Sequence, residues 1–453
     1  MEGFSNFKDE GGRLKIGDCY AADLAEYYGT PLYVYDEQAL RKQARTFVEC
    51  FSSDAFASRI LYASKAASFT ALIALAKEEG LCLDVVSEGE LYTALAVDFP
   101  ADRIIFHGNN KLDRELRMAL QAQIGFIVLD NLSEARRLSA LAAEEARPVD
   151  VLLRVNPGVE AHTHAYIKTA TSDSKFGIAL DEAPAVLAEI AALDRLNLRG
   201  VHCHIGSQIF AADAFLKAAH LMLDLMAALK AEGLSLDILD LGGGFGVFYE
   251  TGDAPFALAP FLRQLAADIA DEAQQRDLSL AEVWLEPGRS MVNEAGLTLY
   301  RVGDVKRLKD GVNYAFIDGG MGDNMRVALY QAGYTAVLAD RLRDAADENW
   351  RVAGKYCESG DVLIKDKPLP TPHPGDILAI LGTGAYTFSM FSGYNRLLRP
   401  AVVFVDGSRQ QAVVRRESLE DILRNDMTLL AKTEMTPAPP QDKTGTVTSS
   451  LPL

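Results

Sequence analysis

Eight short apolar segments alternate with helix-like stretches over residues 59–289, and this alternation limits the possible folds more than any other feature of the sequence. The apolar segments are residues 60–63, 82–86, 104–107, 126–129, 149–155, 198–205, 236–241 and 283–285. The stretches between them, such as 112–121, 133–146 and 211–232, carry apolar residues at helical spacing. Eight strand-then-helix units predict an α/β protein with a (β/α)₈ barrel of the TIM type. A doubly wound open sheet is the weaker alternative.

A polar residue or a glycine stands at, or just after, the end of each predicted strand. These residues are Lys65, Ser87, Asn109, Asp130, Asn156, His204, Gly242 and Glu286. In barrel enzymes the carboxyl ends of the strands meet on one rim, and that rim carries the chemistry. We therefore expect an active site at the mouth of the barrel.

The sequence changes character after about residue 293. Short strand-like segments at 297–306, 314–317, 362–364, 377–380, 401–405 and 411–415 are separated by Gly, Pro and Asp, which predicts a mostly β second domain. A strand-like run at 32–35 lies outside the eightfold pattern and is expected to complete that domain. The predicted organisation is an N-terminal segment at 1–35, a barrel at 36–293, a β-rich domain at 294–433 and a disordered tail at 434–453.

The formal charge of −18 argues against binding to nucleic acid or anionic membranes, which need a basic surface. No apolar run is long enough to span a bilayer, and the first ten residues lack the apolar core of a signal peptide. The five cysteines are scattered and include no Cys-x-x-Cys pair, which favours free thiols over a disulfide framework or a zinc site. We therefore expect a cytoplasmic protein.

One predicted strand ends in three consecutive glycines, Gly242, Gly243 and Gly244, followed by Phe245 and Gly246. Glycines in such a place let backbone N–H groups crowd an anion such as a phosphate. The loop lacks the Gly-Lys-Ser/Thr ending of a nucleotide site, and its spacing is not that of a dinucleotide site. The loop alone is also compatible with an ordinary tight turn.

Three charged residues stand on the predicted rim. Lys65 follows the first barrel strand, where burial would lower its pKa and suit it to Schiff-base chemistry; the alternative is a surface lysine. Glu286 and Arg289 are separated by Pro-Gly, so both face the rim after the eighth strand. They either pair with each other or serve a protonated ring nitrogen and an anion.

Two His-x-His pairs keep a metal-dependent hydrolase open as an alternative. His202 and His204 share a face of one strand, and His162 and His164 repeat the spacing. Only three other histidines exist and no His-Glu-x-x-His motif is present, which weakens the metal hypothesis. His204 could instead stack on a ring. In the β-rich region, a lone thiol at Cys357 beside Glu358 could act as a proton donor or fill the core.

Ten short motifs, in this order, resemble the fold-type III pyridoxal-phosphate-dependent amino-acid decarboxylases, and the resemblance covers residues 17–426. The motifs are Tyr62-Ala-Ser-Lys65, Asp84-Val-Val-Ser-Glu-Gly-Glu-Leu91, His107-Gly-Asn-Asn-Lys111, Arg154-Val-Asn-Pro-Gly158, Ser174-Lys-Phe-Gly177, His204-Ile-Gly-Ser-Gln208, Gly242-Gly-Gly-Phe-Gly246, Glu286-Pro-Gly-Arg289, Cys357-Glu-Ser-Gly-Asp361 and Gly384-Ala-Tyr386. Any one of them is weak evidence, but ten in this order are specific.

The resemblance implies a role for each candidate residue. Lys65 would hold pyridoxal 5′-phosphate as a Schiff base, His204 would stack on its ring and Glu286 would keep the ring nitrogen protonated. The phosphate would be bound by Ser207, Gly242, Gly243, Gly244, Gly288 and Arg289. The distal carboxylate of the substrate would be held by Arg289, Arg326 and Tyr330, with Tyr386 near both phosphate and substrate. Cys357 would protonate the substrate carbon, and Glu358 would bind the distal amino group.

Within the family, the resemblance is strongest to members that convert meso-2,6-diaminopimelate to L-lysine and CO₂, the last step of lysine biosynthesis. Two arginines for a carboxylate and a glutamate for an ammonium suit a diamino diacid. A decarboxylase acting on carboxynorspermidine or on arginine or ornithine is the alternative. In relatives the cysteine and glutamate reach in from the partner subunit, which implies a homodimer with shared sites.

Overall fold

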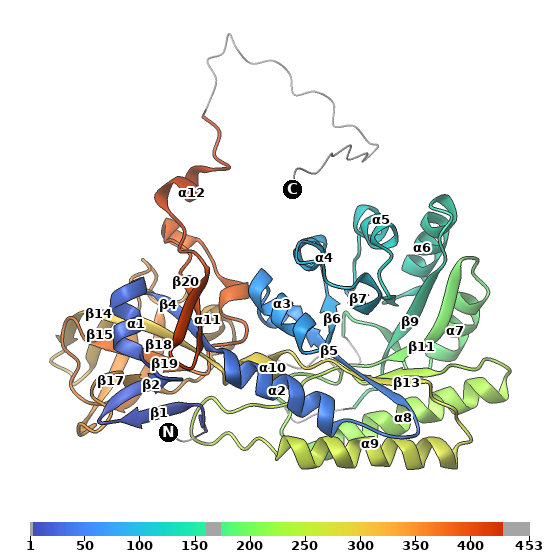
Figure 1. The fold of residues 1–453 in the computed structure, drawn as a ribbon, viewed down its shortest axis with the longest axis horizontal. Coiled ribbons are helices and arrows are strands. Elements are labelled where there is room, and N and C mark those ends of the chain that lie inside the picture. The colour runs from blue at the N-terminus through green and yellow to red at the C-terminus, as the bar shows by residue number, and fades with distance from the viewer. Residues whose placement is uncertain (1–2, 160–173, 429–453) are drawn as a thin grey trace, which may run out of the picture.

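The computed structural model describes residues 3–159 and 174–428. Within them the chain forms a helix-covered barrel and a β-rich unit beside it, at the right and left of Figure 1. The predicted tail at 434–453 and the pair His162 and His164 lie outside the described residues.

All eight predicted barrel strands are present. They are β5 (Ala57–Ala63), β6 (Cys82–Val85), β7 (Ile104–Phe106), β8 (Phe126–Leu129), β9 (Val149–Asn156), β11 (Leu196–His202), β12 (Ile238–Asp240) and β13 (Glu282–Leu285). Each strand pairs in parallel with its neighbours, and the β13–β5 and β8–β9 pairings close the ring. The (β/α)₈ barrel is therefore confirmed, and the open-sheet alternative is wrong. A short β10 (Ile178–Ala179) also pairs with β9.

Helices cover the outside of the barrel (Figure 1). They are α2 (Glu37–Cys50), α3 (Thr70–Glu78), α4 (Glu88–Leu95), α5 (Asp113–Ala122), α6 (Leu132–Glu144), α7 (Ala183–Ala191), α8 (Ala212–Ala231) and α9 (Leu258–Gln275). A single buried turn, α10 (Arg289–Val292), follows β13. Side-chain caps start several of the outer helices: Ser87 Oγ accepts from the Glu90 N–H, and Asn131 accepts from the Glu134 N–H. Ser87, one of the polar residues at the strand ends, thus serves as the N-cap of α4.

The interior of the barrel is filled by apolar side chains, as a packed core requires. One buried cluster comes from seven different strands and consists of Leu61, Cys82, Ile105, Phe126, Val128, Leu152, Ile238 and Trp284. A larger cluster lies between the strands and the surrounding helices. The chemistry of the barrel is consequently confined to the ends of the strands.

The β-rich unit consists mainly of β14 (Gly296–Arg307), β15 (Asn313–Ile317), β16 (Ala336–Leu338), β17 (Glu348–Ala353), β18 (Val362–Leu369), β19 (Ile377–Leu381), β20 (Ala401–Asp406) and β21 (Arg409–Val414). The N-terminal strand β4 (Leu32–Asp36) lies between β14 and β20, antiparallel to the first and parallel to the second. The prediction that the N-terminal segment completes this sheet is confirmed. Short helices α11 (Met325–Tyr330) and α12 (Leu419–Leu423) belong to the same half of the chain.

The sequence prediction missed several short strands. β1 (Phe7–Glu10), β2 (Arg13–Ile16) and β3 (Cys19–Tyr20) form a separate three-stranded sheet, followed by α1 (Ala21–Tyr28). β16 and β17 were also not predicted. Strands of this length, with an exposed face, carry few apolar residues and give a weak periodic signal.

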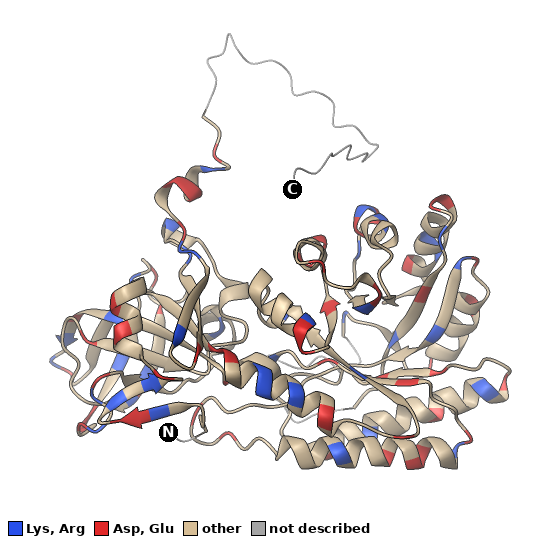
Figure 2. Cartoon of the chain, viewed as in Figure 1, with Lys and Arg blue, Asp and Glu red and all other residues tan. Residues whose placement is uncertain are grey.

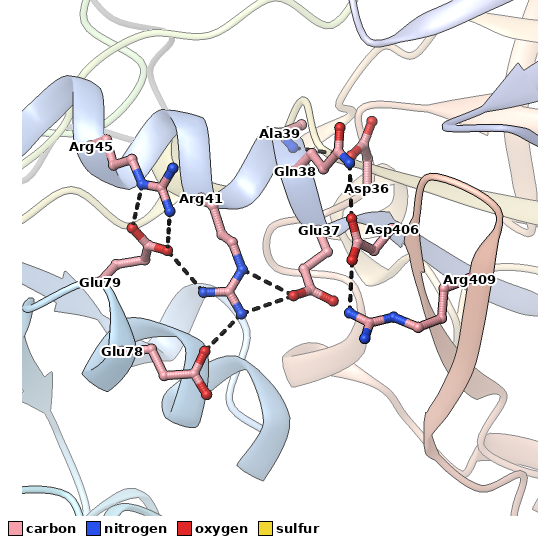
Figure 3. A network of polar contacts seen from close by, with 10 residues as sticks. All are labelled: Asp36, Glu37, Gln38, Ala39, Arg41, Arg45, Glu78, Glu79, Asp406 and Arg409. Atoms are coloured by element: carbon pink, nitrogen blue, oxygen red, sulfur yellow. Dashed lines mark hydrogen bonds and ion pairs between the residues drawn. The ribbon is translucent and has the colours of Figure 1, made fainter.

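Helix α2 connects the two units, because it follows β4 of the β-rich sheet and packs on the barrel. Figure 3 shows its polar contacts: the Arg41 guanidinium bonds to Glu37, to Glu78 at 2.7 Å and to Glu79 at 2.8 Å on or just after α3. On the other side, the Gln38 amide donates to Asp406 Oδ1 at 2.9 Å at the end of β20. The same helix therefore contacts barrel and sheet.

Acidic and basic residues are both spread over the outer helices and the β-rich strands (Figure 2). Acidic residues outnumber basic ones, 63 to 45. Among the described residues, no helix is both long and apolar enough to cross a membrane.

Candidate active site

The main cavity lies at the carboxyl ends of the barrel strands and has a volume of about 410 Å³. Eight of the predicted site residues line it: Lys65, His204, Ser207, Gly244, Glu286, Gly288, Arg289 and Tyr386. Tyr386 comes from the β-rich unit, and its backbone N–H donates to Ala66 O at 2.7 Å beside Lys65. The cavity is thus built by both units of the chain.

The floor of this cavity is a layer of ionisable side chains. Side chains alternate along a strand, so the residue two positions beyond a core residue faces the barrel axis one layer higher. Six of the apolar core residues are followed, two positions later in the sequence, by an ionisable residue. These ionisable residues are Asp84, His107, Asp130, Arg154, Asp240 and Glu286. His202, the last residue of β11, joins this layer beside Glu286. An apolar core thus carries a charged floor directly below the cavity.

Lys65 lies just beyond β5, in a short 3₁₀ turn (Ser64–Ala66), and is half-buried at the wall of the cavity. Its Nζ is 3.7 Å from Asp84 Oδ2. Burial alone lowers the pKa of the Lys65 ammonium, but Asp84, Tyr386 and Glu286 outweigh it, and the pKa is raised. The expectation of a lowered lysine pKa is therefore wrong. It considered the burial of Lys65 alone, without the nearby Asp84 carboxylate.

Glu286 is 5% exposed and sits between two imidazoles. His107 Nε2 lies 2.8 Å from Glu286 Oε1, and His202 Nε2 lies 3.3 Å from Glu286 Oε2. Burial raises the pKa of the Glu286 carboxyl, but the two histidines reverse that effect and hold it well below its usual value. The neighbouring Asp240 shows the opposite: burial first, then the Glu286 charge, raise its pKa well above the usual range. The pKa values of the two neighbouring carboxyls are thus shifted in opposite directions, which favours the negative charge on Glu286.

His204 and the glycine run are packed against each other. The Gly243 N–H donates to His204 Nδ1 at 3.2 Å, and burial, followed by the charges of Lys65 and Arg154, lowers the pKa of His204 well below its usual value. A Cβ on Gly243 would lie 2.1 Å from Glu286 O, and one on Gly242 would lie 2.6 Å from Cys203 O. The first two glycines are therefore required for close backbone approach, and Gly244 reaches the cavity wall.

Arg289 and Arg326 form a pair of buried guanidiniums, 9% and 3% exposed. Arg289 donates to Ser207 Oγ at 2.9 Å and to the Tyr249 hydroxyl. The Arg326 guanidinium carbon lies 4.4 Å from the centre of the Tyr249 ring, and it donates to the Tyr334 hydroxyl. Among the described residues neither arginine forms an ion pair with a carboxylate, so the structure offers two buried positive charges for an anion.

Four predicted residues with side chains do not line this cavity: Arg326, which is buried behind Tyr249, and Tyr330, Cys357 and Glu358. Cys357 is exposed, and its backbone N–H donates to Asn395 Oδ1 at 2.8 Å. Glu358 is also exposed, and Tyr330 is 38% exposed at the end of α11. Within a single chain, these side chains do not line the cavity that contains Lys65.

The site also contains residues to which the sequence reasoning gave no role. Asp84, His107, Arg154 and Phe176 stand in motifs that were noticed, but only the structure brings them to the cavity or its floor. Tyr249 belonged to no motif. A charged residue inside an otherwise apolar strand, as in β6 and β9, is the signal that could have revealed two of them, since charges are rarely buried without a partner.

The predicted histidine pair does not converge on a metal. His202 faces Glu286, whereas His204 faces the glycine run. The ligand atoms of His107, His202 and Glu286 do lie within 4.8 Å of one another. Among the described residues, no group of three converging ligands includes His204.

The residues present fit the pyridoxal phosphate that the resemblance implies. The cavity walls carry an amine at Lys65 and an imidazole at His204, and hydroxyl and guanidinium donors at Ser207 and Arg289. Two buried atoms, Glu286 Oε1 and Arg289 Nε, have no partner with hydrogen-bond geometry among the described residues. An amine, a carboxylate and an anion site around one cavity match the aldehyde, ring nitrogen and phosphate of that cofactor.

Comparisons with known proteins agree with this geometry. A family model described as pyridoxal-dependent decarboxylase, pyridoxal binding domain, matches residues 37–293. The chain is 47% identical over 423 residues to a diaminopimelate decarboxylase of Bacillus subtilis (strain 168), covering 93% of this chain and 96% of the relative. A relative of the same name from Staphylococcus aureus (strain COL) is 43% identical, with 92% and 98% covered.

A solved structure gives the same result. The diaminopimelate decarboxylase of M. jannaschii in complex with L-lysine superposes with a TM-score of 0.88 at 32% identity, covering 95% of this chain and 99% of that one. Family model, sequence relatives and solved structure all span the barrel with its charged floor. The chain therefore belongs to the diaminopimelate decarboxylase family of pyridoxal-dependent decarboxylases.

Proposed function

We propose that this protein decarboxylates meso-2,6-diaminopimelate to L-lysine and CO₂ with pyridoxal 5′-phosphate, as the last step of lysine biosynthesis. The observation that carries the substrate proposal is the pair of buried arginines. Arg289 and Arg326 are bonded to hydroxyl groups and aromatic rings, and among the described residues to no carboxylate. A substrate with a second carboxylate supplies the missing negative charge.

The cofactor, when bound, supplies the sink for the electron pair that remains on the substrate carbon when CO₂ leaves. In our proposal Lys65 is the amine that carries it, and Glu286 holds the proton on its ring nitrogen. His204 packs on the ring. The phosphate is held by Ser207, Gly242, Gly243, Gly244, Gly288 and Arg289, and Tyr386 lies near both phosphate and substrate.

We assign the distal end of the substrate to Arg289, Arg326 and Tyr330. Two guanidiniums bind its carboxylate, and Tyr330 completes that subsite in the proposal. Tyr249 keeps the guanidiniums apart, since its hydroxyl accepts from one and its ring lies against the other. A substrate without the distal carboxylate would leave two buried positive charges uncompensated.

We further propose a homodimer in which Cys357 and Glu358 of one chain complete the site of the other. Cys357 donates the proton that replaces CO₂ on the substrate carbon, and Glu358 binds the distal ammonium. The exposure of both residues, away from the cavity of their own chain, supports this proposal. We also place the protein in the cytoplasm, in line with five cysteines that are all free thiols in the structure.

The test is to incubate purified protein with pyridoxal 5′-phosphate and meso-2,6-diaminopimelate and to measure L-lysine and CO₂. Borohydride reduction followed by peptide mapping is expected to place the cofactor on Lys65, and Lys65→Ala serves as the control that loses it. A protein that cannot be loaded with the cofactor would contradict the proposal.

The alternative substrates are carboxynorspermidine, arginine and ornithine. CO₂ release measured across all of these substrates decides among them, and only a clear preference for meso-2,6-diaminopimelate supports our assignment. Arginine and ornithine lack a distal carboxylate, so we expect their turnover to be lower by orders of magnitude.

A further inference from the structure

The carboxylate of Glu286 is enclosed by ionisable groups from other strands of the barrel. His107 follows β7, His202 ends β11 and Asp240 ends β12, and each of them reaches the floor of the cavity beside Glu286. The charges of Asp84, Arg154 and Lys65 also act on this carboxylate. Apart from Lys65, and His202 as a candidate metal ligand, none of these neighbours of Glu286 received a role from the sequence.

Two of these groups contact Glu286 on different oxygens. His107 Nε2 approaches Oε1 at 2.8 Å, and His202 Nε2 approaches Oε2 at 3.3 Å. The two imidazole rings stand edge to face with centroids 5.0 Å apart, at an interplanar angle of 70°. Both rings are buried, at 4% and 1% exposure. The carboxylate therefore has an imidazole against each oxygen: His202 hydrogen-bonds to Oε2, whereas His107 lies close to Oε1 without hydrogen-bond geometry, and the two rings are packed together.

These contacts stabilise the negative charge of the buried Glu286 carboxylate. A carboxyl buried in a barrel takes up a proton unless polar groups stabilise its charge. Burial also lowers the pKa of His202 to about 4, so His202 acts as a neutral ring that donates its Nε2–H to Glu286. Asp240 and Asp84 have no imidazole hydrogen-bonded to them, and burial raises the pKa of both carboxyls. The negative charge is thereby concentrated on Glu286.

We propose that His107 and His202 are positioning residues that hold Glu286 as a preformed, ionised carboxylate directed at the ring nitrogen of the cofactor. The inference rests on the role proposed for Glu286 above. It assigns the two histidines a function that acts through Glu286, so their effect depends on the presence of that carboxylate.

The experiment measures the dissociation constant of pyridoxal 5′-phosphate from the full-length protein by absorbance titration. His202→Met removes the donor at similar volume, and His202→Gln keeps an N–H donor. We expect the methionine variant to bind the cofactor roughly 10- to 100-fold more weakly, as for a lost hydrogen bond to a buried charge, and the glutamine variant to recover most of that loss. His107→Met is expected to weaken binding in the same direction.

A double-mutant cycle with Glu286→Gln separates positioning from general structure. In the Glu286→Gln background, His202→Met is expected to change the dissociation constant less than twofold, because the charge that it serves is gone. Equal weakening with and without Glu286 would overturn the inference, and so would unchanged binding in His202→Met. The exposed His373→Met is the matched control and should bind the cofactor like the parent protein.

The pH dependence of the bound cofactor's absorbance gives a second measurement. We expect the His202→Met spectrum to change within the range of pH 5–8 in which the parent spectrum is constant, and a spectrum as constant as the parent's would overturn the inference. If the parent protein itself fails to bind the cofactor, the proposed function fails as well. Stoichiometric zinc that is lost in His202→Met would instead identify a metal site and overturn the inference.

Discussion

Tyr249 contacts both arginines of the anion site that we propose. Its hydroxyl accepts a hydrogen bond from Arg289, while its ring lies 4.4 Å from the Arg326 guanidinium and 5.2 Å from the Tyr334 ring. Two cations that are buried near each other repel. Contact with the face of an aromatic ring or with a hydroxyl acceptor stabilises each of them. Tyr249 contacts both cations at once, through different parts of its side chain, and so fixes the position of one guanidinium relative to the other.

Replacing Tyr249 by Phe tests this role at the residue scale. The ring under Arg326 remains, but Arg289 loses an acceptor and gains rotational freedom. We expect the KM for meso-2,6-diaminopimelate to rise about tenfold with little change in kcat, because uniform binding of the distal carboxylate is lost. Product inhibition by L-lysine, which keeps that carboxylate, should weaken by a similar factor.

A matched control is available in Tyr300→Phe. The Tyr300 hydroxyl is buried and has no hydrogen-bond partner among the described residues, so its removal should leave KM unchanged. Equal KM values in Tyr249→Phe and the parent protein would show that Arg289 is positioned by Ser207 alone.

At the scale of elements, the loop at residues 318–323 contacts both the segment that carries Arg326 and the segment that carries Cys357. In residues 318–323, Asp323 Oδ2 accepts from the Gly320 N–H at 2.8 Å, directly before the turn into α11 that carries Arg326. Asp361 accepts from the Met321 N–H at 2.6 Å and from the Tyr356 N–H at 2.9 Å, next to Cys357. Two buried carboxyls thus tie the segment of Arg326 to the segment of Cys357.

These carboxyls make the stability of the segment depend on pH. Burial raises the pKa of Asp323 to about 7 and that of Asp361 to about 6. The unfolded chain releases these protons near pH 4, whereas the folded chain keeps them up to the raised values. The free energy of unfolding therefore falls as the pH rises from about 4 to 7.

Asp323→Asn removes the titration but keeps an oxygen acceptor for Gly320. Relative to the parent, we expect the variant to gain about 1–3 kcal/mol in free energy of unfolding between pH 5 and pH 8, measured by urea denaturation. The exposed Asp54→Asn should show no such gain. A difference between variant and parent that is the same at both pH values would contradict the raised pKa.

The sequence was sufficient to predict the barrel, and four of the eight residues expected on its rim line the cavity. Eight apolar segments gave the eight strands, and the polar residue after each strand led to Lys65, His204 and Glu286 at the cavity. The sequence was not sufficient to predict which side chains of different strands contact each other. Nothing local to Lys65 indicates Asp84, and nothing local to Glu286 indicates His107, because these contacts exist only when parallel strands align their ends.

The β-rich half was harder to predict for a related reason. β17 and the three-stranded N-terminal sheet are short and partly exposed, so their apolar periodicity is weak. The positions of Arg326 and Cys357 depend on a loop held by Asp323 and Asp361, which are distant in sequence from each other. Only the resemblance to a family indicated that these residues belong to the same chemistry.

At the scale of the whole molecule, the proposed functional groups lie in two separate places on the chain. The cavity has the amine, the ionised carboxylate and the anion site, while Cys357 and Glu358 are exposed on the β-rich unit. A two-fold homodimer places the same surface patch of each chain against the other, so a donor on one chain can reach the cavity of its partner. Sharing of residues across such an interface predicts a specific pattern of complementation.

Lys65→Ala and Cys357→Ala variants should each be nearly inactive as pure homodimers, because every site in them lacks one group. When the two variants are co-expressed and form mixed dimers, one of the two sites in each mixed dimer contains both Lys65 and Cys357. Random pairing then restores about a quarter of the parent activity per total dimer, since half of the dimers are mixed and half of their sites are intact. A double variant carrying both substitutions on one chain, co-expressed with the parent, gives mixed dimers in which neither site is complete. The parent homodimers then leave about a quarter of the parent activity, against about half if each chain used its own Cys357, and this mixture is the matched control. The activity of each mixture is measured as L-lysine formation. If the co-expressed pair is no more active than Lys65→Ala or Cys357→Ala alone, each chain uses its own Cys357.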